Sequence, residues 1–342
     1  MWSKRDGSRW IRPEPFAWEV KTISRSIGYQ TLYETAKMYY LDNISQEEIA
    51  RKLSLSRSQI SRNLKKARNL GIVEIRLNQP RETDCEELAC RLKNRLELKN
   101  VLVAQLDHPA KPGDEEVISA IATTAARYLE TLIPAAGIVG IGWGRTVYRT
   151  VIGIGSVSKA FNTTFIPLIG SAGQYEPQYQ VNTLVDRLSE KFSGKVVFLN
   201  SPAILNSDDA VNHSRTRRNI SQAERMWVLC DLAIIGLGGP VQNSPVLRSE
   251  INPELIVKLL KREAVGDILA RFFDSHGEIC NAEVETSIFG IDINVLQTIK
   301  TVVCLSGGEI KIKGIITAAS KGFFNVLITD AWSARKILEI LD

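Results

Sequence analysis

The sequence predicts an α/β protein in two parts, an N-terminal winged helix-turn-helix and a larger domain built on a doubly wound parallel sheet. The first part is indicated by two short amphipathic segments with helix-capping residues between positions 45 and 71. The second is indicated by wholly apolar runs that alternate with helical stretches after residue 99. At 342 residues the chain is long enough for two cores.

The charge is distributed unevenly along the chain. Of a net charge of +5, residues 1–76 carry about +7 and the remainder about −2, so the N-terminal part is expected to meet a polyanion. No apolar run approaches the roughly 18 residues of a membrane span, and the N-terminus lacks the apolar core of a signal peptide. Five scattered cysteines without zinc spacing predict a reduced, cytoplasmic protein with no metal site and no membrane partner.

Residues 31–80 predict the winged helix-turn-helix domain. A helix is expected over Tyr33–Tyr40, and Ser45 with Glu48 forms a capping box that opens the next one. Ser56 can cap the following helix, whose apolar residues recur at helical spacing, and "IVEIRL" then alternates like the strand of a wing. Ser54 stands in the turn where this fold usually has glycine. Residues 1–30 are an N-terminal extension, either a tail that touches DNA or a partner, or simply a partly ordered segment.

The outer face of the second helix predicts contacts with double-stranded operator DNA. Hydroxyl, amide and guanidinium groups can bind base edges, and positive charges bind phosphates. We expect base contacts from Arg57, Ser58, Gln59 and Ser61, and backbone contacts from Arg62, Lys65 and Lys66. The alternative is a plain helical hairpin with a solvated basic face.

Residues 81–98 are amphipathic and predict a linker helix, and residues 99–342 predict the effector and oligomerisation domain. Seven apolar runs are expected to be strands: "NVLVAQL", "GIVGIGW", "TTFIPLIG", "KVVFLNSP", "LAIIGLGG", "TVVCLSGG" and "NVLITD". Helical stretches between them include residues 115–132, 182–192, 310–322 and 331–341. Since several runs end in glycine or small polar residues, a ligand is expected at the carboxyl ends of the strands.

The stretch "GIGWGRT" (140–146) predicts a compact anion rather than a nucleotide. Its G-x-G-x-G spacing differs from the dinucleotide fingerprint, the next strand does not end in an acid, and no Walker lysine pattern is present. A glycine loop followed by Arg145 and Thr146 suits the phosphate of a sugar phosphate.

These motifs together resemble the SorC family of sugar-responsive bacterial transcriptional regulators. The resemblance covers nearly all of the chain after residue 30, including "EEIARKLSLSRSQISRNLKKARNLGIVEIRL", "GIGWGRTVY", "DLAIIGLG", "GDILARFFDSHGEI" and "LSGGEIKIKGIITAASKGFFNVLITDAWSARKIL". It implies an effector domain related to phosphosugar isomerases and deaminases, and a homo-oligomer, commonly a tetramer. A sugar or sugar phosphate bound at the strand ends would change the affinity of the protein for its operator DNA.

The resemblance also implies a set of effector contacts, with no cofactor, metal or catalytic residue. They are Gly144, Arg145, Thr146, Gly170, Ser171, Gly173, Asn182, Gly236, Gly238, Asp274 and Lys311. Each has an alternative: the glycines can serve turns only, Asn182 can be structural, Asp274 can cap a helix or lie in solvent, and Lys311 can be solvated.

The competing class is a sugar-phosphate isomerase or deaminase with an appended DNA-binding domain. Such chemistry needs a carboxylate or histidine placed to move a proton. The three histidines, at 108, 213 and 276, lie in polar stretches without an evident orienting partner, and His276 is nearest a candidate ligand residue. The sequence therefore predicts a regulator of a carbohydrate-utilisation operon rather than an enzyme.

Overall fold

The computed structural model describes residues 19–42, 44–73, 83–106, 111–157, 161–171, 177–204, 223–243, 253–280 and 288–342. The chain divides into two compact units, Met1–Pro80 and Arg81–Asp342.

Three helices form the described part of the first unit: α1 (Glu19–Tyr40), α2 (Gln46–Leu53) and α3 (Arg57–Asn69). α1 begins well before Tyr33, where the sequence pattern predicts a helix to start. Gly28 lies inside it and weakens the helical signal of the preceding residues. The three helices share a small apolar core made of Leu32, Ala36, Ile49, Ala50, Ile60, Leu64 and Ala67.

The predicted helix caps are confirmed. The Ser45 side chain accepts the Glu48 backbone N–H, and Glu48 in turn accepts the Ser45 N–H, which completes the capping box. The Ser56 hydroxyl accepts the Gln59 N–H at 3.2 Å. Ser54, in the turn between α2 and α3, has φ +54°, a left-handed conformation that favours glycine. Residues 74–82 lie outside the described residues, so the wing stays a prediction.

Among the described residues of the second unit, seven parallel strands form one sheet in the order β1-β9-β8-β5-β2-β3-β4. Each of them lies in one of the seven apolar runs that predict strands. Their bounds are β1 (Asn100–Ala104), β2 (Ile138–Ile141), β3 (Thr164–Pro167), β4 (Lys195–Val196), β5 (Leu232–Gly236), β8 (Thr301–Leu305) and β9 (Val326–Asp330). In register, Gly140 pairs with Ile166 on one side and with Ala233 on the other.

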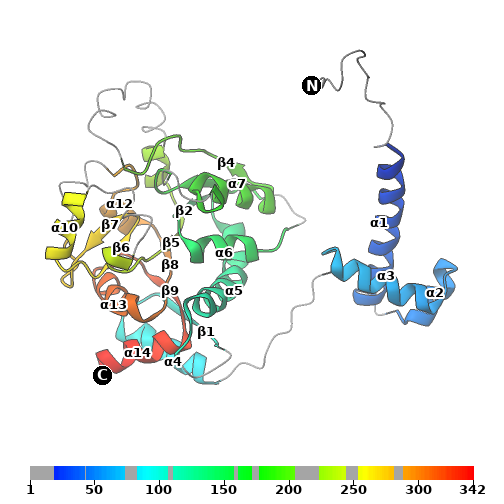
Figure 1. Cartoon of the computed structure of the whole chain (residues 1–342), viewed down its shortest axis with the longest axis horizontal. Helices are drawn as coiled ribbons and strands as arrows, with labels where there is room; N and C mark the ends of the chain where they lie inside the picture. The colour runs from blue at the N-terminus through cyan, green and yellow to red at the C-terminus, as the bar shows by residue number, and fades with distance from the viewer. Residues whose placement is uncertain are drawn as a thin grey trace, which may run out of the picture. The chain divides into compact units, whose positions relative to one another are not determined.

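Helices cover both faces of this sheet, as Figure 1 shows. One face carries α5 (Asp114–Leu132), α6 (Arg145–Gly153) and α7 (Val181–Phe192), whose apolar residues pack on alternate strand positions such as Val139, Ile141 and Ile234. The other core includes residues of α4 (Thr83–Arg95), α10 (Pro253–Lys261), α12 (Ile293–Thr298), α13 (Ile312–Ser320) and α14 (Ala331–Leu341). Short 3₁₀ helices are η1 (Ile133–Ala135), η2 (Pro177–Tyr179), η3 (Val241–Asn243) and η4 (Glu309–Lys311). In the described part of the chain, none of the helices combines the length and apolarity of a membrane span.

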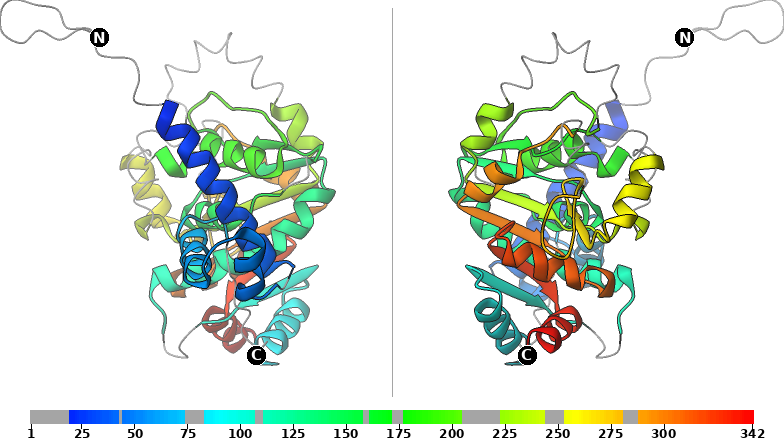
Figure 2. Two further views of the ribbon diagram at one scale, coloured as in Figure 1. Left: turned by 90° about the vertical axis from the view of Figure 1, so that its right-hand side faces the viewer. Right: turned by 90° about the vertical axis from the view of Figure 1, so that its left-hand side faces the viewer.

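α4 is part of the second unit rather than a free linker. Its Leu88 and Leu92 are buried in the core, and it lies beside α14 (Figure 2). Ion pairs join the two helices: Arg335 binds Asp84, and Arg91 and Arg95 both bind the C-terminal residue Asp342.

A two-stranded antiparallel hairpin, β6 (Gly266–Ile268) and β7 (Arg271–Phe273), is absent from the sequence prediction. Leu269 and Ala270 form its turn with φ +50° and +63°. Turns of this kind normally use Asn or Gly, so the sequence gives no hairpin signal here.

Candidate functional site

The sheet has its topological switch point between β2 and β5. From β2 the chain proceeds to β3 and β4 on one side, and from β5 it proceeds to β8 and β9 on the other. In open parallel sheets the connections then leave a crevice beyond the carboxyl ends of these two strands. The segments after β2 and β5 therefore lie at this crevice, and the segment after β8 lies beside them.

α6 begins with an open glycine turn after β2. Gly144 is its N-cap residue with φ +127°, and no described atom lies within 4 Å of the position that a Cβ would take there. The first N–H groups of a helix lack intrahelical acceptors and favour an anion. Arg145 is exposed at the first position of this helix, and Thr146 next to it is buried. These three predicted residues thus form one helix start at the switch point.

The segment after β5 lies against a buried carboxylate. Gly238 and Asp267 exchange backbone hydrogen bonds, and a Cβ at Gly238 would lie 1.9 Å from the Asp267 side chain. Gly236 is close to the Trp143 carbonyl at the end of β2. Gly238 is therefore required by packing against Asp267, a residue absent from the sequence prediction.

Asp267 and Lys311 form the charged centre of this edge of the sheet. Burial raises the pKa of Asp267 to about 7, although the Ala270 N–H and the charge of Lys311 oppose the shift. Burial also lowers the pKa of Lys311, with Asp267 opposing and Arg145 adding to the shift. Cys304, buried on β8, has its pKa raised by burial to about 12, so its thiol stays neutral. A half-protonated carboxyl near an amine can both donate and accept hydrogen bonds at neutral pH.

Acidic side chains from α5 hold the arginine of this site. Arg145 lies 3.4 Å from Glu115 and 3.9 Å from Asp114, while Arg149 lies 3.2 Å from the same Glu115. All four side chains are at least half exposed, so these ion pairs are weak and exchangeable. Arg145 is thus available to an incoming anion that competes with Glu115.

The predicted residues after β3 serve a backbone junction. A Cβ at Gly170 would lie 2.5 Å from the Pro202 carbonyl oxygen, because the segment after β4 crosses closely. The Ser171 N–H donates to the Ser201 carbonyl, and the Ala203 N–H donates to the Ser171 carbonyl. Gly173 lies outside the described residues. The effector role of these residues stays a prediction.

Two further predicted residues are placed by the structure in supporting roles. The Asn182 side-chain amide both donates to the Leu199 carbonyl and accepts the Leu199 N–H, each at 3.0 Å. Asp274 accepts the backbone N–H groups of His276 and Glu278 and so caps a turn. That turn contacts Thr317 in α13 and Lys321 just after it, whereas Lys311 immediately precedes the first residue of this helix. The expectation that Asp274 binds the effector stays a prediction, and Asp267 is a carboxylate whose charge acts on Lys311.

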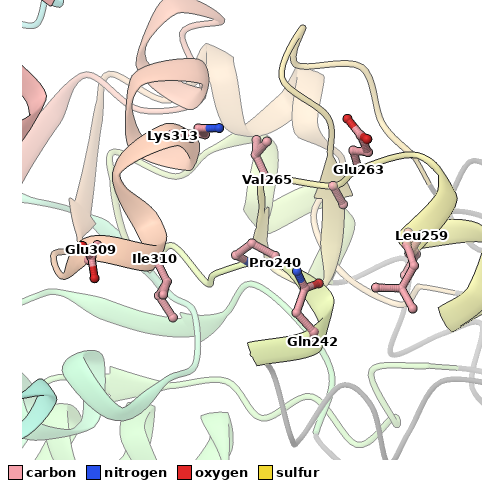
Figure 3. Close-up of a pocket in the computed structure, with 10 residues that line it drawn as sticks. Pro240, Gln242, Leu259, Glu263, Val265, Glu309, Ile310 and Lys313 are labelled. Atoms are coloured by element: carbon pink, nitrogen blue, oxygen red, sulfur yellow. The ribbon is translucent and has the colours of Figure 1, made fainter. Parts of the chain in front are cut away.

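A pocket of about 410 Å³ adjoins the strand ends (Figure 3). Its walls include Pro240 and Gln242 after β5, Leu259 of α10, and Ile310 of η4. Its volume suits a small ligand. The charged residues around it are mixed, namely Glu263, Glu309 and Lys313. None of the predicted effector residues lines it, although Ile310 is next to Lys311 in the sequence.

The outer face of α3 carries the predicted DNA contacts. Arg57, Ser58, Ser61, Arg62, Lys65 and Lys66 are exposed. Gln59 is half-buried and donates to Asn63 at 3.1 Å, and Arg57 lies 3.7 Å from Glu47 of α2. The predicted set therefore shares one surface, with Gln59 engaged partly inside the unit.

Groups that would indicate an enzyme or a metal centre are not brought together in the described ranges. Those residues contain no cluster of three or more His, Cys, Asp or Glu that could hold a metal ion. His276 lies in the Asp274 turn, away from Lys311. His108 and His213 lie outside the described residues.

A family model described as "Putative sugar-binding domain" matches residues 81–339. The chain is 27% identical to the sorbitol operon regulator of Klebsiella pneumoniae, over 93% of this chain and 100% of that protein. It is 26% identical to the deoxyribonucleoside regulator of Bacillus subtilis, over 91% and 98% of the two chains. These relatives are named as regulators rather than enzymes.

Solved structures of regulators have the same fold. The full-length sorbitol operon regulator SorC from Klebsiella pneumoniae superposes with a TM-score of 0.75 at 28% identity, covering 90% of this chain and 98% of that one. A probable sor operon regulator from Shigella flexneri superposes with a TM-score of 0.67 at 26% identity, covering 74% and 99%.

Proposed function

The chain belongs to the SorC family of transcriptional regulators, and from this premise we propose that it controls a carbohydrate-utilisation operon in response to a sugar phosphate. The observation that supports a phosphate ligand is a pair of open glycine turns, one after β2 at the switch point and the other after β8. Gly144 opens α6 and Gly308 opens η4, both with positive φ and with no described atom where a Cβ would lie. Arg145 directly follows Gly144, and Lys311 is the last residue of η4.

The effector is expected to place its phosphate at the start of α6. Backbone N–H groups and the Arg145 guanidinium can bind phosphate oxygens, and Lys311 adds positive charge. Asp267 is suited to a sugar hydroxyl, because a carboxyl with a pKa near 7 can donate or accept a hydrogen bond. Buried polar groups of this kind discriminate strongly between a hydroxyl and its absence.

The DNA contact of the proposal is the outer face of α3, and the acting species is a cytoplasmic homo-oligomer, a tetramer. Helix-turn-helix proteins read paired half-sites as dimers, so one chain alone would not supply both recognition helices. The names of the relatives support an operator as the target.

Transmission from the effector to the operator is proposed to run through α14 and α4. Asp84, at the start of α4, is bound by Arg335 of α14 and lies close in sequence to Pro80, where the two units divide. An effector with different affinities for two arrangements of these helices would shift their populations.

The experiment is a thermal-shift screen of the full chain against matched sugars and sugar phosphates, including hexitol and pentitol forms. A ligand that binds only the folded state raises the melting temperature. The matched variants are Arg145→Gln and Arg149→Gln. Both arginines lie on α6 and contact Glu115, but only Arg145 is at the helix start.

A phosphorylated compound that stabilises the wild type and Arg149→Gln, but not Arg145→Gln, supports the proposal. If free sugars alone stabilise the protein, the effector is not a sugar phosphate and that part of the proposal fails. Substituting Ile310 by Ala enlarges the neighbouring pocket, and the phosphate-dependent shift is expected to survive this change. Its loss in Ile310→Ala, with retention in Arg145→Gln, would move the effector site to the pocket.

A further inference from the structure

The loop that precedes Lys311 has a fixed and crowded geometry. A Cβ at Gly307 would lie 2.3 Å from the Asp330 carboxylate, and Gly308 has φ +93°. The Lys311 N–H donates to the Gly308 carbonyl at 3.1 Å, so the position of Gly308 determines where η4 and its lysine begin.

Two buried side chains, Ser333 and Asp330, form a hydrogen-bonded relay that holds Gly308. Asp330 ends β9 and Ser333 lies in the first turn of α14, and both side chains are fully buried. The Ser333 hydroxyl and the Asp330 carboxylate are 2.5 Å apart, and the Gly308 N–H donates to the Ser333 oxygen at 2.7 Å. Since the hydroxyl has one proton and a carboxylate can only accept, Ser333 must donate to Asp330. The lone pairs of Ser333 are thereby directed at Gly308.

The hydroxyl is not needed to start α14. Asp330 already caps that helix by accepting the Ser333 backbone N–H at 2.9 Å, a bond that any residue except proline can supply at position 333. Besides its bond to the capping Asp330, the Ser333 hydroxyl accepts the N–H of Gly308 in the loop that carries Lys311.

We propose that Ser333 and Asp330 are positioning residues for the anion site, because they fix the Gly308 loop from which Lys311 begins. This inference rests on the proposed function, since the site that they position is the one assigned there to the phosphate. Removing the hydroxyl leaves the Gly308 N–H without its acceptor, and loops with an unpaired N–H rearrange.

The test compares the full-length wild type with Ser333→Ala and with Ser189→Ala. Ser189 is also buried and bonded within one helix, to the Asp186 carbonyl of α7, so it reproduces the loss of one buried serine away from the loop. The dissociation constants of inorganic phosphate, ribose 5-phosphate and sorbitol 6-phosphate are measured by calorimetry. Hydrogen exchange of the peptide that contains Gly308 is measured on the same samples.

Ser333→Ala is expected to accelerate exchange at Gly308 and to weaken the binding of each probe that the wild type binds by about tenfold. Ser189→Ala is expected to change neither quantity. If Ser333→Ala does not fold, Ser333→Cys replaces it, because a thiol of similar size is a weak acceptor.

Faster exchange with an unchanged dissociation constant overturns the positioning role and leaves a structural one. Unchanged exchange overturns the relay itself. If the wild type binds none of the three probes, the proposed function fails, and the exchange rate still decides whether Ser333 holds the loop.

Discussion

At the scale of single residues, the buried Asp267 dominates the electrostatics of the site. Its pKa is about 7 in the folded chain against an ordinary value of 3.8, so the folded state retains its proton longer than the unfolded state does. Stability contributed at this position therefore falls as the pH rises from about 4 to about 7.

Asp267→Asn is expected to remove the fall in stability that the wild type shows as the pH rises. Relative to the wild type, the variant should gain unfolding free energy between pH 4 and pH 7, on the order of 4 kcal/mol from the size of the shift. Urea unfolding at several pH values measures the difference. A gap between variant and wild type that stays constant across this range would show that the carboxyl titrates normally.

Glu115, which forms an ion pair with Arg145, is the subject of a second prediction. Glu115→Gln removes one competitor for the guanidinium, so a sugar phosphate should bind more tightly. Exposed ion pairs contribute up to about 1 kcal/mol, which corresponds to a gain of about fivefold or less. Calorimetric titration of wild type and variant checks the direction, and weaker binding by Glu115→Gln would place Arg145 outside the phosphate contact.

The positions of the candidate site residues were only partly predictable from the sequence. Gly144, Arg145, Gly238 and Lys311 could be placed at the strand ends because they follow apolar runs whose ends meet at one edge of a parallel sheet, and their effector role stays a prediction. Asp267 could not, because the turn at Leu269 and Ala270 uses neither Asn nor Gly, and the hairpin therefore leaves no pattern.

At the scale of elements, the turn between α2 and α3 stores strain at Ser54. A non-glycine residue in the left-handed region costs roughly 1 kcal/mol. Ser54→Gly is therefore expected to stabilise the N-terminal unit by up to about 1 kcal/mol. The gain is reduced because glycine gives the unfolded chain more conformational entropy. The full chain is heated, and hydrogen exchange of α2 and α3 reports the unfolding of residues 19–80. The difference between variant and wild type measures the change in stability. A lowered protection of both helices would contradict the strain argument.

The proposed signal passes through the contact between helices α14 and α4. Arg335→Ala removes the ion pair with Asp84, which is not one of the proposed anion-site residues. The effector should then bind with its wild-type affinity but change the affinity for DNA less. Parallel titrations with effector and with DNA separate these quantities, and an intact response in Arg335→Ala would exclude this route.

Elements were predictable where their pattern is long or wholly apolar. All seven strands of the described sheet fall in predicted runs, because a strand covered on both faces is apolar throughout. α4 was expected to be a linker, since its amphipathic pattern shows an apolar face without showing what covers it. Leu88 and Leu92 are covered by the core of the second unit.

At the scale of the whole molecule, a unit with a basic helix-turn-helix is joined to a second unit that carries the proposed anion site. The proposal is that occupancy of that site changes the affinity for DNA. The two units have separate cores, so a measurement on the full chain tests this coupling.

The decisive measurement is a fluorescence titration of the full chain with a duplex selected by the protein from a random pool. It is performed without and with a saturating sugar phosphate identified by thermal shift, and repeated with Arg145→Gln. The dissociation constant for DNA is expected to change at least tenfold for the wild type and not at all for the variant. If a compound stabilises the wild-type protein while its DNA affinity stays the same, occupancy of the site does not control DNA binding.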